Sequence, residues 1–257
     1  MEKIKTICLI STFHDPEGDR ALKFLKKHLK KIKNLFGFIK LAITDKTSEE
    51  IIQFLEKNKV DYKITSFGFG TLSRRIVLKN GLKTNATHFF HIDLDRLLFW
   101  LEKYPRELTN TLKKIKDLKE NEYLTLGRTQ KAWQAYPSWQ EKPEKRTNQA
   151  ISKEINQKVD VTTGCYASGR SLAKIISQKP KGKTPGVSDI EWLMIAKLFG
   201  KAQIKSIKTN GLTYETKLIF GKKRAQKPKG NYPFSREKLA DKTIKMIEKT
   251  LSRREQL

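Results

Sequence analysis

The sequence contains little cysteine and no apolar run long enough to cross a lipid bilayer. Its 2 cysteines, Cys8 and Cys165, stand in apolar, strand-like surroundings, which argues against a disulfide framework or a cysteine-based metal cluster. The apolar run within residues 1–12 is too short for a signal peptide and lacks a small-residue cleavage site. We therefore expect a soluble, cytoplasmic protein.

Acidic residues are scarce relative to basic ones. The chain has 54 Lys and Arg against 27 Asp and Glu, a formal net charge of +27. Such a charge favours anionic partners, which include nucleic acids, acidic membranes and phosphorylated substrates. An AT-rich genome would also produce a chain rich in Lys, Ile and Asn. Because the lysines decorate nearly every expected helix and no nucleic-acid recognition motif occurs, no specific nucleic acid is expected, and nucleic-acid or polyanion binding is kept as an alternative.

Short apolar runs alternate with amphipathic segments, and 37% of the residues are hydrophobic, enough for a sizeable core. Strands are expected at 6–12, 36–44, 62–67, 88–93, 122–129, 159–168, 202–209 and 212–220. Helices are expected at 21–36, 48–58, 71–84, 105–119, 148–159, 169–178 and 189–200. Loops are expected at 131–145, which is rich in aromatics, and at 179–188, which has the composition of a lid. This alternation predicts an α/β fold with a mostly parallel sheet.

Carboxylates stand where several expected strands end. The stretch HFFHIDLDRLLFW (88–100) places Asp93 and Asp95 at the end of a buried run, and Asp15 and Asp45 follow the first two strands. The structural interpretation is a solvated turn in which Asp95 caps the next helix. Strand alternation would instead send Asp93 and Asp95 to the same side, together with His91. Because parallel strands end at one edge of a sheet, these carboxylates are expected to lie on a common rim.

Five segments resemble, in order, the motifs of family-2-type glycosyltransferases of the GT-A fold. They are STFHDPEG (11–18), AITDKTSEE (42–50), GTLSRRIVLKNGLKTNATHFFHIDLD (70–95), VTTGCYASGRSLAKI (161–175) and SDIEWLMIAKLFG (188–200). The resemblance covers roughly residues 5–217. The first loop departs from the family by lacking Pro-x-Tyr-Asn-Glu, and Ser188 replaces the first acidic residue of the Glu-Asp pair.

The resemblance implies a GT-A-type three-layer α/β/α sandwich with a mixed, mostly parallel sheet. It divides residues 1–220 into a nucleotide-binding half, about 1–100, and an acceptor half, about 101–220. Residues 221–257 would form a basic linker and an amphipathic helix whose stripe contains Ala240, Ile244, Ile247 and Leu251. We expect this helix to cap the sheet, although contact with an anionic membrane at the inner face is an alternative.

The same resemblance implies a site for Mn²⁺ or Mg²⁺ and a nucleotide-sugar donor linked to UDP or GDP. Asp93 and Asp95 would form the D-x-D motif, with Asp95 favoured as the direct metal ligand and Asp93 near the metal or ribose. His91 is at least as well explained as a structural histidine. Further donor contacts are expected from Thr12, Asp15, Asp45, and either Arg74 or Arg75, the other arginine lying on the surface.

Transfer to an acceptor hydroxyl calls for a general base. The resemblance implies Asp189 for this role, with Glu191 as the second candidate. The acceptor is left open and includes lipid-linked or cell-envelope glycans. A sugar-phosphate nucleotidylyltransferase is a further alternative, because GFGTLSRR (68–75) echoes a G-x-G-T-R loop; that loop should follow the first strand, whereas here it follows the third.

Overall fold

The computed structural model describes residues 4–67, 70–179, 188–221 and 236–252. Within them a seven-stranded sheet has the order β3-β2-β1-β4-β6-β5-β7. The strands are β1 (Ile4–Phe13), β2 (Phe36–Thr44), β3 (Asp61–Thr65), β4 (His88–His91), β5 (Glu122–Arg128), β6 (Tyr166–Gly169) and β7 (Gln203–Thr209). β6 runs against its neighbours β4 and β5, and the remaining pairs are parallel. The prediction of a mixed, mostly parallel sheet is therefore confirmed.

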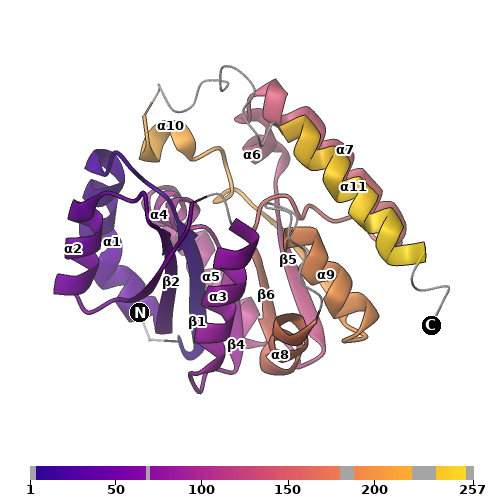
Figure 1. The fold of residues 1–257 in the computed structure, drawn as a ribbon, viewed down its shortest axis with the longest axis horizontal. Coiled ribbons are helices and arrows are strands. Elements are labelled where there is room, and N and C mark those ends of the chain that lie inside the picture. The colour runs from indigo at the N-terminus through magenta and orange to yellow at the C-terminus, as the bar shows by residue number, and fades with distance from the viewer. Residues whose placement is uncertain (1–3, 68–69, 180–187, 222–235, 253–257) are drawn as a thin grey trace.

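Helices cover both faces of this sheet, which gives the predicted three layers (Figure 1). One hydrophobic core packs α1 (Asp19–Leu35), α2 (Glu49–Lys57), α4 (Leu94–Lys103) and α5 (Pro105–Lys116) against one face. A second core packs α3 (Gly70–Leu82), α8 (Arg170–Gln178) and α9 (Ser188–Leu198) against the other. The amphipathic pattern explains this arrangement: Leu25, Leu29 and Ile32 of α1 are all buried, while the lysines between them face water.

Three predicted elements are wrong. The segment expected as an aromatic loop forms α6 (Gln130–Gln134) and the start of α7 (Ser138–Glu154). The strand expected at 159–168 is confined to Tyr166–Gly169, because the chain turns at Gly164, whose φ is 65°. The strand expected at 212–220 is a turn followed by α10 (Thr216–Ile219).

A buried arginine explains the first of these differences. The guanidinium of Arg128, at the end of β5, lies 3.4 Å from the ring centre of Trp133, so the aromatic side chains of the segment pack inward. The same guanidinium donates to Glu144 Oε2 at 2.5 Å and to Asp160 Oδ1 at 2.7 Å. Burial alone would raise the pKa of both carboxyls, but Arg128 holds both pKa values below their ordinary range.

Replacing Arg128 by Met is expected to lower the free energy of unfolding by about 3 kcal/mol, because two buried carboxylates would lose their counter-charge. Urea denaturation measures this change. Arg146→Met is the matched control, since Arg146 pairs with Glu237 and Asp241 at the surface and its loss should cost less than about 1 kcal/mol. Equal effects of the two substitutions would contradict the assignment of Arg128 as a core ion pair.

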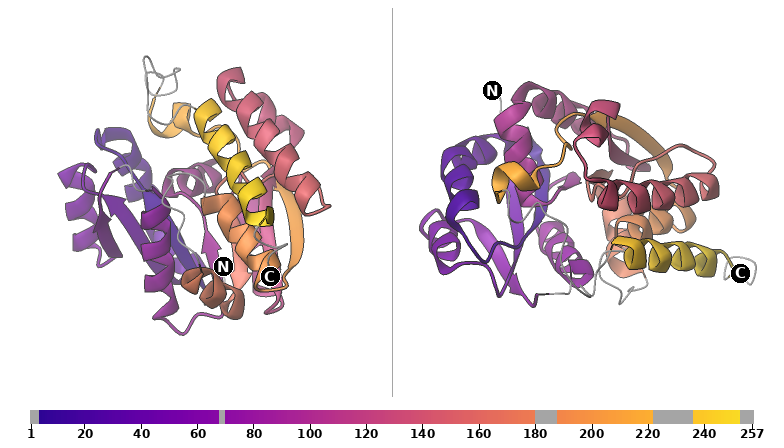
Figure 2. Two further views of the ribbon diagram at one scale, coloured as in Figure 1. Left: turned by 45° about the vertical axis from the view of Figure 1, so that its right-hand side comes forward. Right: turned by 90° about the horizontal axis from the view of Figure 1, so that it is seen from above.

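The C-terminal helix α11 (Arg236–Ser252) lies alongside α7 (Figures 1 and 2). Ala240 and Ile247 of its predicted stripe are buried, and Ile247 joins the second core. The predicted linker falls largely on residues 222–235, and these lie outside the described residues, as do the side chain of Leu251 and most of the predicted loop 179–188. None of the helices that the structure describes is both long and apolar enough to span a membrane. Contact with a membrane surface stays a prediction.

Candidate functional site

The site is built where β1 and β4 end side by side. The two strands are parallel with Ile10 opposite His91, so the next residues of β1 face the turn that leaves β4. Ser11 Oγ donates to the carbonyl oxygen of Ile92 at 2.6 Å, and Thr12 Oγ1 donates to Asp93 Oδ1 at 2.6 Å. The end of β1 therefore fixes both the backbone and the carboxylate of this turn.

Asp93 and Asp95 do not alternate along a strand, and this part of the prediction is wrong. β4 ends at His91, Asp93 is the N-cap residue of α4 in an extended conformation, and Asp95 lies in the first turn of that helix. The N-cap residue of α4 is Asp93 and not, as the structural interpretation expected, Asp95. The Asp93 side chain makes no capping hydrogen bond. Its carboxylate instead accepts hydrogen bonds from Thr12 Oγ1 and from the guanidinium of Arg74.

The two aspartates of the predicted D-x-D motif have opposite electrostatic surroundings. Burial would raise the pKa of Asp93, but the neighbouring Arg74 guanidinium holds that pKa below its ordinary value. Burial raises the pKa of Asp95 to about 8, and the negative charges of Glu215 and Asp93 add to this effect. A cation bound nearby would favour the charged form of such a carboxyl and lower its pKa.

Glu215 is a carboxylate of the site that the sequence analysis missed. It is 5% exposed, stands at the start of α10, and pairs with Arg96 at 3.9 Å. Its Oε2 atom is buried and has no hydrogen-bond partner among the described residues. The signal was its position in the segment that follows the last parallel strand, β7, which ends at Thr209 on the same edge of the sheet as β1 and β4.

Arg74 connects the carboxylate of Asp93 to the start of helix α9. Its Nη2 atom lies 3.4 Å from both oxygens of Asp93, its Nη1 atom donates to Ser188 Oγ at 3.0 Å, and it forms an ion pair with Asp189. A Cβ atom at Gly164 would stand 2.9 Å from Arg74 Nη2, so a side chain at this position would displace the guanidinium from its present place. Arg74 and Asp189, predicted from different motifs, are thus in direct contact.

Asp189 and Glu191 occupy different surroundings although both belong to the first turn of α9. Burial raises the pKa of Asp189 to about 6, with Arg74 acting in the opposite direction. Glu191 forms a buried ion pair with Arg75 at 2.5 Å. The expectation that the second arginine lies on the surface is therefore wrong: Arg75 is 5% exposed, because it neutralises Glu191 in the interior.

His91 is a buried neutral side chain beneath the carboxylates. Its Nδ1 atom donates to the carbonyl oxygen of Gly164 at 2.7 Å, and its ring stacks on Tyr166 at 4.7 Å between centroids. Burial and the charge of Arg74 lower its pKa to about 3. These contacts support the structural interpretation of this histidine.

A second polar group lies along the same edge, where β2 and β3 end. Asp45 Oδ1 accepts a hydrogen bond from the backbone N–H of Phe67 at 2.9 Å. The Phe67 ring is 45% exposed and stacks on His14 at 4.4 Å between centroids. Asp15 is buried, and its carboxylate accepts from the backbone N–H of Glu17 at 3.3 Å. A flat aromatic pair therefore stands beside the carboxylate of Asp45.

Solved structures share this architecture. Mannosyl-3-phosphoglycerate synthase from Rubrobacter xylanophilus aligns with a TM-score of 0.60 and 10% identity, over 98% of this chain and 75% of that one. Glucosyl-3-phosphoglycerate synthase from Mycobacterium tuberculosis, in complex with UDP, aligns with a TM-score of 0.53 and 12% identity, over 94% of this chain and 78% of that one. This chain has the GT-A fold. No protein-family model and no curated protein sequence matches it.

A third structure, of the Mycobacterium tuberculosis synthase with Mn²⁺, UDP-glucose and glycerol 3-phosphate, aligns with a TM-score of 0.53 and 12% identity over 93% of this chain and 77% of that one. In the GT-A chain described here, burial and the negative charges of Glu215 and Asp93 raise the pKa of Asp95. Hard carboxylate oxygens are the ligands that Mn²⁺ and Mg²⁺ take in proteins. The orphaned Oε2 of Glu215 and the raised pKa of Asp95 fit a divalent cation at this position.

The side chains do not form a complete cage by themselves. Over the described ranges, no three His, Cys, Asp or Glu residues are grouped closely enough to hold a metal ion alone. Mg²⁺ in proteins is commonly held by one or two carboxylates, with the remaining positions filled by phosphate oxygens and water. The GT-A edge of this chain therefore suits a cation that is shared between the protein and a phosphorylated ligand.

Proposed function

We propose that this chain is a metal-dependent glycosyltransferase that moves a sugar from a UDP- or GDP-linked donor to an acceptor hydroxyl. The observation that carries the proposal is the meeting of Asp93, Asp95 and Glu215 with Arg74 and Asp189 at the carboxyl edge of a GT-A sheet. Two similar solved structures are complexes with UDP and with UDP-glucose and Mn²⁺, which supports the choice of donor class.

Asp95 and Glu215 would hold Mn²⁺ or Mg²⁺, with Asp93 beside them and able to reach the metal or the ribose. When bound, the cation neutralises the negative charge that grows on the diphosphate leaving group. Thr12 orients Asp93 through its 2.6 Å hydrogen bond. Arg74 faces the same space and would add a second positive charge to the diphosphate, as guanidinium groups do in many phosphate sites.

The nucleoside would lie toward β2 and β3. Asp45 and Asp15 remain the predicted contacts for the base and ribose. The exposed ring of Phe67, held by stacking on His14, offers a flat surface on which a nucleobase can stack. This places the base and the diphosphate along one edge of the sheet, in the order in which β2, β1 and β4 are arranged.

Asp189 would take the proton from the acceptor hydroxyl. Its pKa of about 6 leaves it ionised at neutral pH while keeping it a stronger base than an exposed aspartate. Arg74 contacts it and would hold the carboxylate beside the donor. Glu191 is the weaker candidate, because Arg75 engages its carboxylate in the interior.

A thermal-shift titration with UDP, GDP and UDP-glucose, with and without Mn²⁺ and at moderate salt, tests the proposal. One nucleotide at 100-fold excess over its Kd should raise the Tm by about 5–10 °C, and only with the metal present. A DNA oligonucleotide is the control for charge alone. Equal stabilisation by every polyanion, with or without metal, would contradict the proposal and favour the binding alternative.

A further inference from the structure

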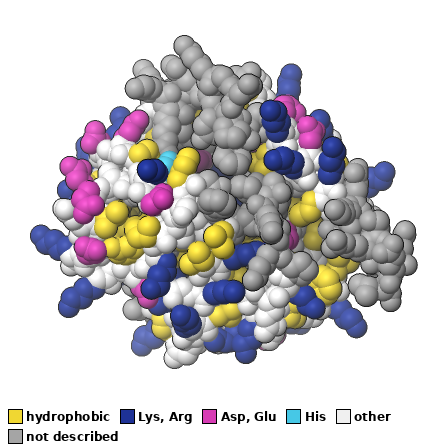
Figure 3. Space-filling view, viewed as in Figure 1, with side chains coloured by type: hydrophobic (Ala, Val, Ile, Leu, Met, Phe, Trp, Pro, Cys, Tyr) yellow, Lys and Arg dark blue, Asp and Glu magenta, His cyan; other side chains and the backbone are white. Residues whose placement is uncertain are grey.

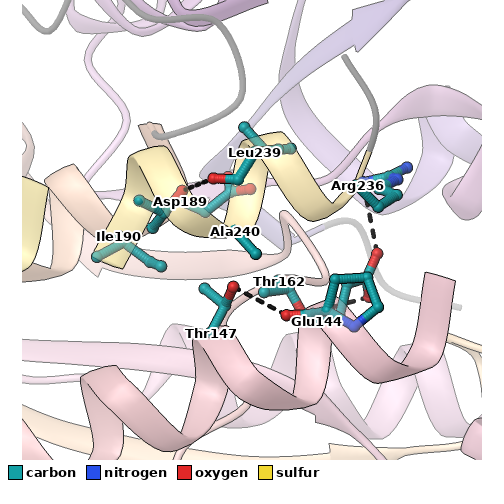
Figure 4. A pocket seen from close by; sticks show the side chains of 10 residues that line it. Glu144, Thr147, Thr162, Asp189, Ile190, Arg236, Leu239 and Ala240 are labelled. Atoms are coloured by element: carbon teal, nitrogen blue, oxygen red, sulfur yellow. Dashed lines mark hydrogen bonds and ion pairs between the residues drawn. The ribbon is translucent and has the colours of Figure 1, made fainter. Parts of the chain in front are cut away.

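A pocket opens between α7, α9 and α11, next to Asp189 (Figure 4). We propose that it is the acceptor site of the glycosyltransferase and that it binds a neutral, hydroxyl-rich compound such as a sugar or polyol. This inference rests on the proposed function and adds to it the location and chemical class of the acceptor. The polar side chains that line the pocket are Glu144, Thr147, Thr162, Asp189, Arg236 and Thr243.

Asp189 connects this pocket to the donor side. It lines the pocket, and it is also in ion-pair contact with Arg74, which lies 3.4 Å from both oxygens of Asp93. An acceptor hydroxyl that entered the pocket and met Asp189 would therefore lie next to the space assigned to the donor. That position is the one a hydroxyl needs if Asp189 is to remove its proton.

The threonine hydroxyls of the pocket already donate hydrogen bonds to other groups of the protein. Thr147 donates to the carbonyl oxygen of Pro143 at 3.0 Å, Thr243 donates to that of Leu239 at 2.7 Å, and Thr162 lies 3.3 Å from Glu144 Oε2. The hydroxyl oxygens of Thr147 and Thr243 keep lone pairs with which they can accept a further hydrogen bond, whereas Thr162 Oγ1 already accepts from Arg128 and Asn148. The two free acceptor oxygens and the carboxylate of Asp189 match a ligand that donates O–H groups.

The charges around the pocket offer an anionic acceptor no excess of positive charge. Three carboxylates, Glu144, Asp160 and Asp189, are connected to it directly or through Arg128. Three guanidinium groups balance them: Arg128, Arg236 and Arg74, the last of which pairs with Asp189. Arg236 is already 3.4 Å from Glu144. The local charge is thus close to neutral, although the whole chain carries +27. On the face drawn in Figure 3, Lys and Arg side chains lie at the margins and across the lower part of the surface.

Apolar side chains complete the pocket. Pro143 and Ile190 come from α7 and α9, and Leu239 and Ala240 come from α11. A wall of this kind packs against the C–H faces of a sugar ring, while its hydroxyls reach the polar groups. Since α11 supplies several lining residues, including Arg236 and Thr243, the C-terminal helix forms part of the site in addition to covering the core.

Saturation-transfer NMR with the methyl glycosides of glucose, mannose and galactose tests this assignment, with UDP and Mg²⁺ present. The double variant Thr147→Val/Thr243→Val removes two acceptor oxygens and keeps the helices. We expect at least one glycoside to bind the wild type, and its Kd to rise about tenfold in the double variant. Thr109→Val is the matched control, because Thr109 Oγ1 makes the same contact to the carbonyl of Pro105, on α5.

Calorimetry of UDP with Mg²⁺, run on each variant, separates the two proposals. Unchanged UDP affinity together with weakened glycoside binding in the double variant alone supports the acceptor pocket. If UDP binds but no glycoside does, or if 3-phosphoglycerate binds in their place, the neutral acceptor class is wrong. Glycoside binding that survives in the double variant would place the acceptor elsewhere. Failure of UDP to bind the wild type would overturn the proposed function, and the acceptor role with it.

Discussion

Replacing Asp95 by Asn is expected to abolish the stabilisation by UDP that depends on Mn²⁺ and to lower kcat/KM for sugar transfer by about 10³-fold or more. The substitution removes the carboxylate that we assign to the cation. Without metal, the same variant should be the more stable protein at pH 8. Burial, Glu215 and Asp93 raise the pKa of Asp95 from 3.8 to about 8, so ionisation of Asp95 destabilises the metal-free fold.

The sign follows from the direction of this shift. The pKa of Asp95 is higher in the folded state than in the unfolded state. The free energy of unfolding therefore falls progressively as the pH rises from about 4 to about 8. The asparagine variant should lack this decline. Urea denaturation between pH 4 and pH 8 measures it, and Asp19→Asn, in the first turn of α1, is the matched control. An Asp95→Asn variant that is less stable than the wild type at pH 8, yet still responds to Mn²⁺ with UDP, would contradict the assignment.

Replacing Asp189 by Asn is expected to lower the rate of sugar transfer by about 10²–10⁴-fold, the usual contribution of a general base, while the affinity for UDP changes little. The wild-type kcat/KM should fall as the pH drops through about 6, the pKa to which burial raises Asp189, because the protonated carboxyl cannot accept the proton. This acidic limb should be absent from the residual activity of the variant. Rate profiles between pH 5 and pH 8 measure both effects.

Glu191→Gln distinguishes the two carboxylates of α9. Because Arg75 pairs with Glu191 in the interior, this substitution should lower the free energy of unfolding and leave the acidic limb of the rate profile in place. If Glu191→Gln removed the limb while Asp189→Asn retained it, the general base would be Glu191. A variant of either residue that lost UDP binding as well would point to a structural role in the donor site.

The carboxylates that follow buried strands were predictable from the sequence. The apolar runs that became β2 and β4 are short, dense and followed by Asp45 and Asp93, and topology alone brings such ends to one edge. The exact path beyond β4 was not predictable. It depends on hydrogen bonds from Ser11 and Thr12, 81 residues away in sequence, and strand alternation carries no information about such contacts.

Glu215 and the aromatic segment after β5 show what local pattern cannot supply. The stretch LTYETKLIF (212–220) has the residue types of a strand, but no neighbouring strand is placed to pair with it in the described sheet, and it turns into α10. The segment 131–145 has loop-like punctuation, yet Arg128 draws Trp133 against its guanidinium and the chain becomes helical. In both places tertiary contacts override local propensity.

The reversed strand β6 has a consequence for how the molecule is made. Residues 4–91 contain the strands β3, β2, β1 and β4, each joined to the next along the chain by a helix, so this half-sheet can assemble during synthesis from neighbouring segments. Until Tyr166–Gly169 emerges, β4 is left as an open edge that contains Phe89 and Phe90. A bare edge of this kind invites pairing with another chain. The centre of the finished sheet is thus closed only when β6 has been made, well after β3, β2, β1 and β4. We expect the nascent chain to be most prone to aggregation before that closure.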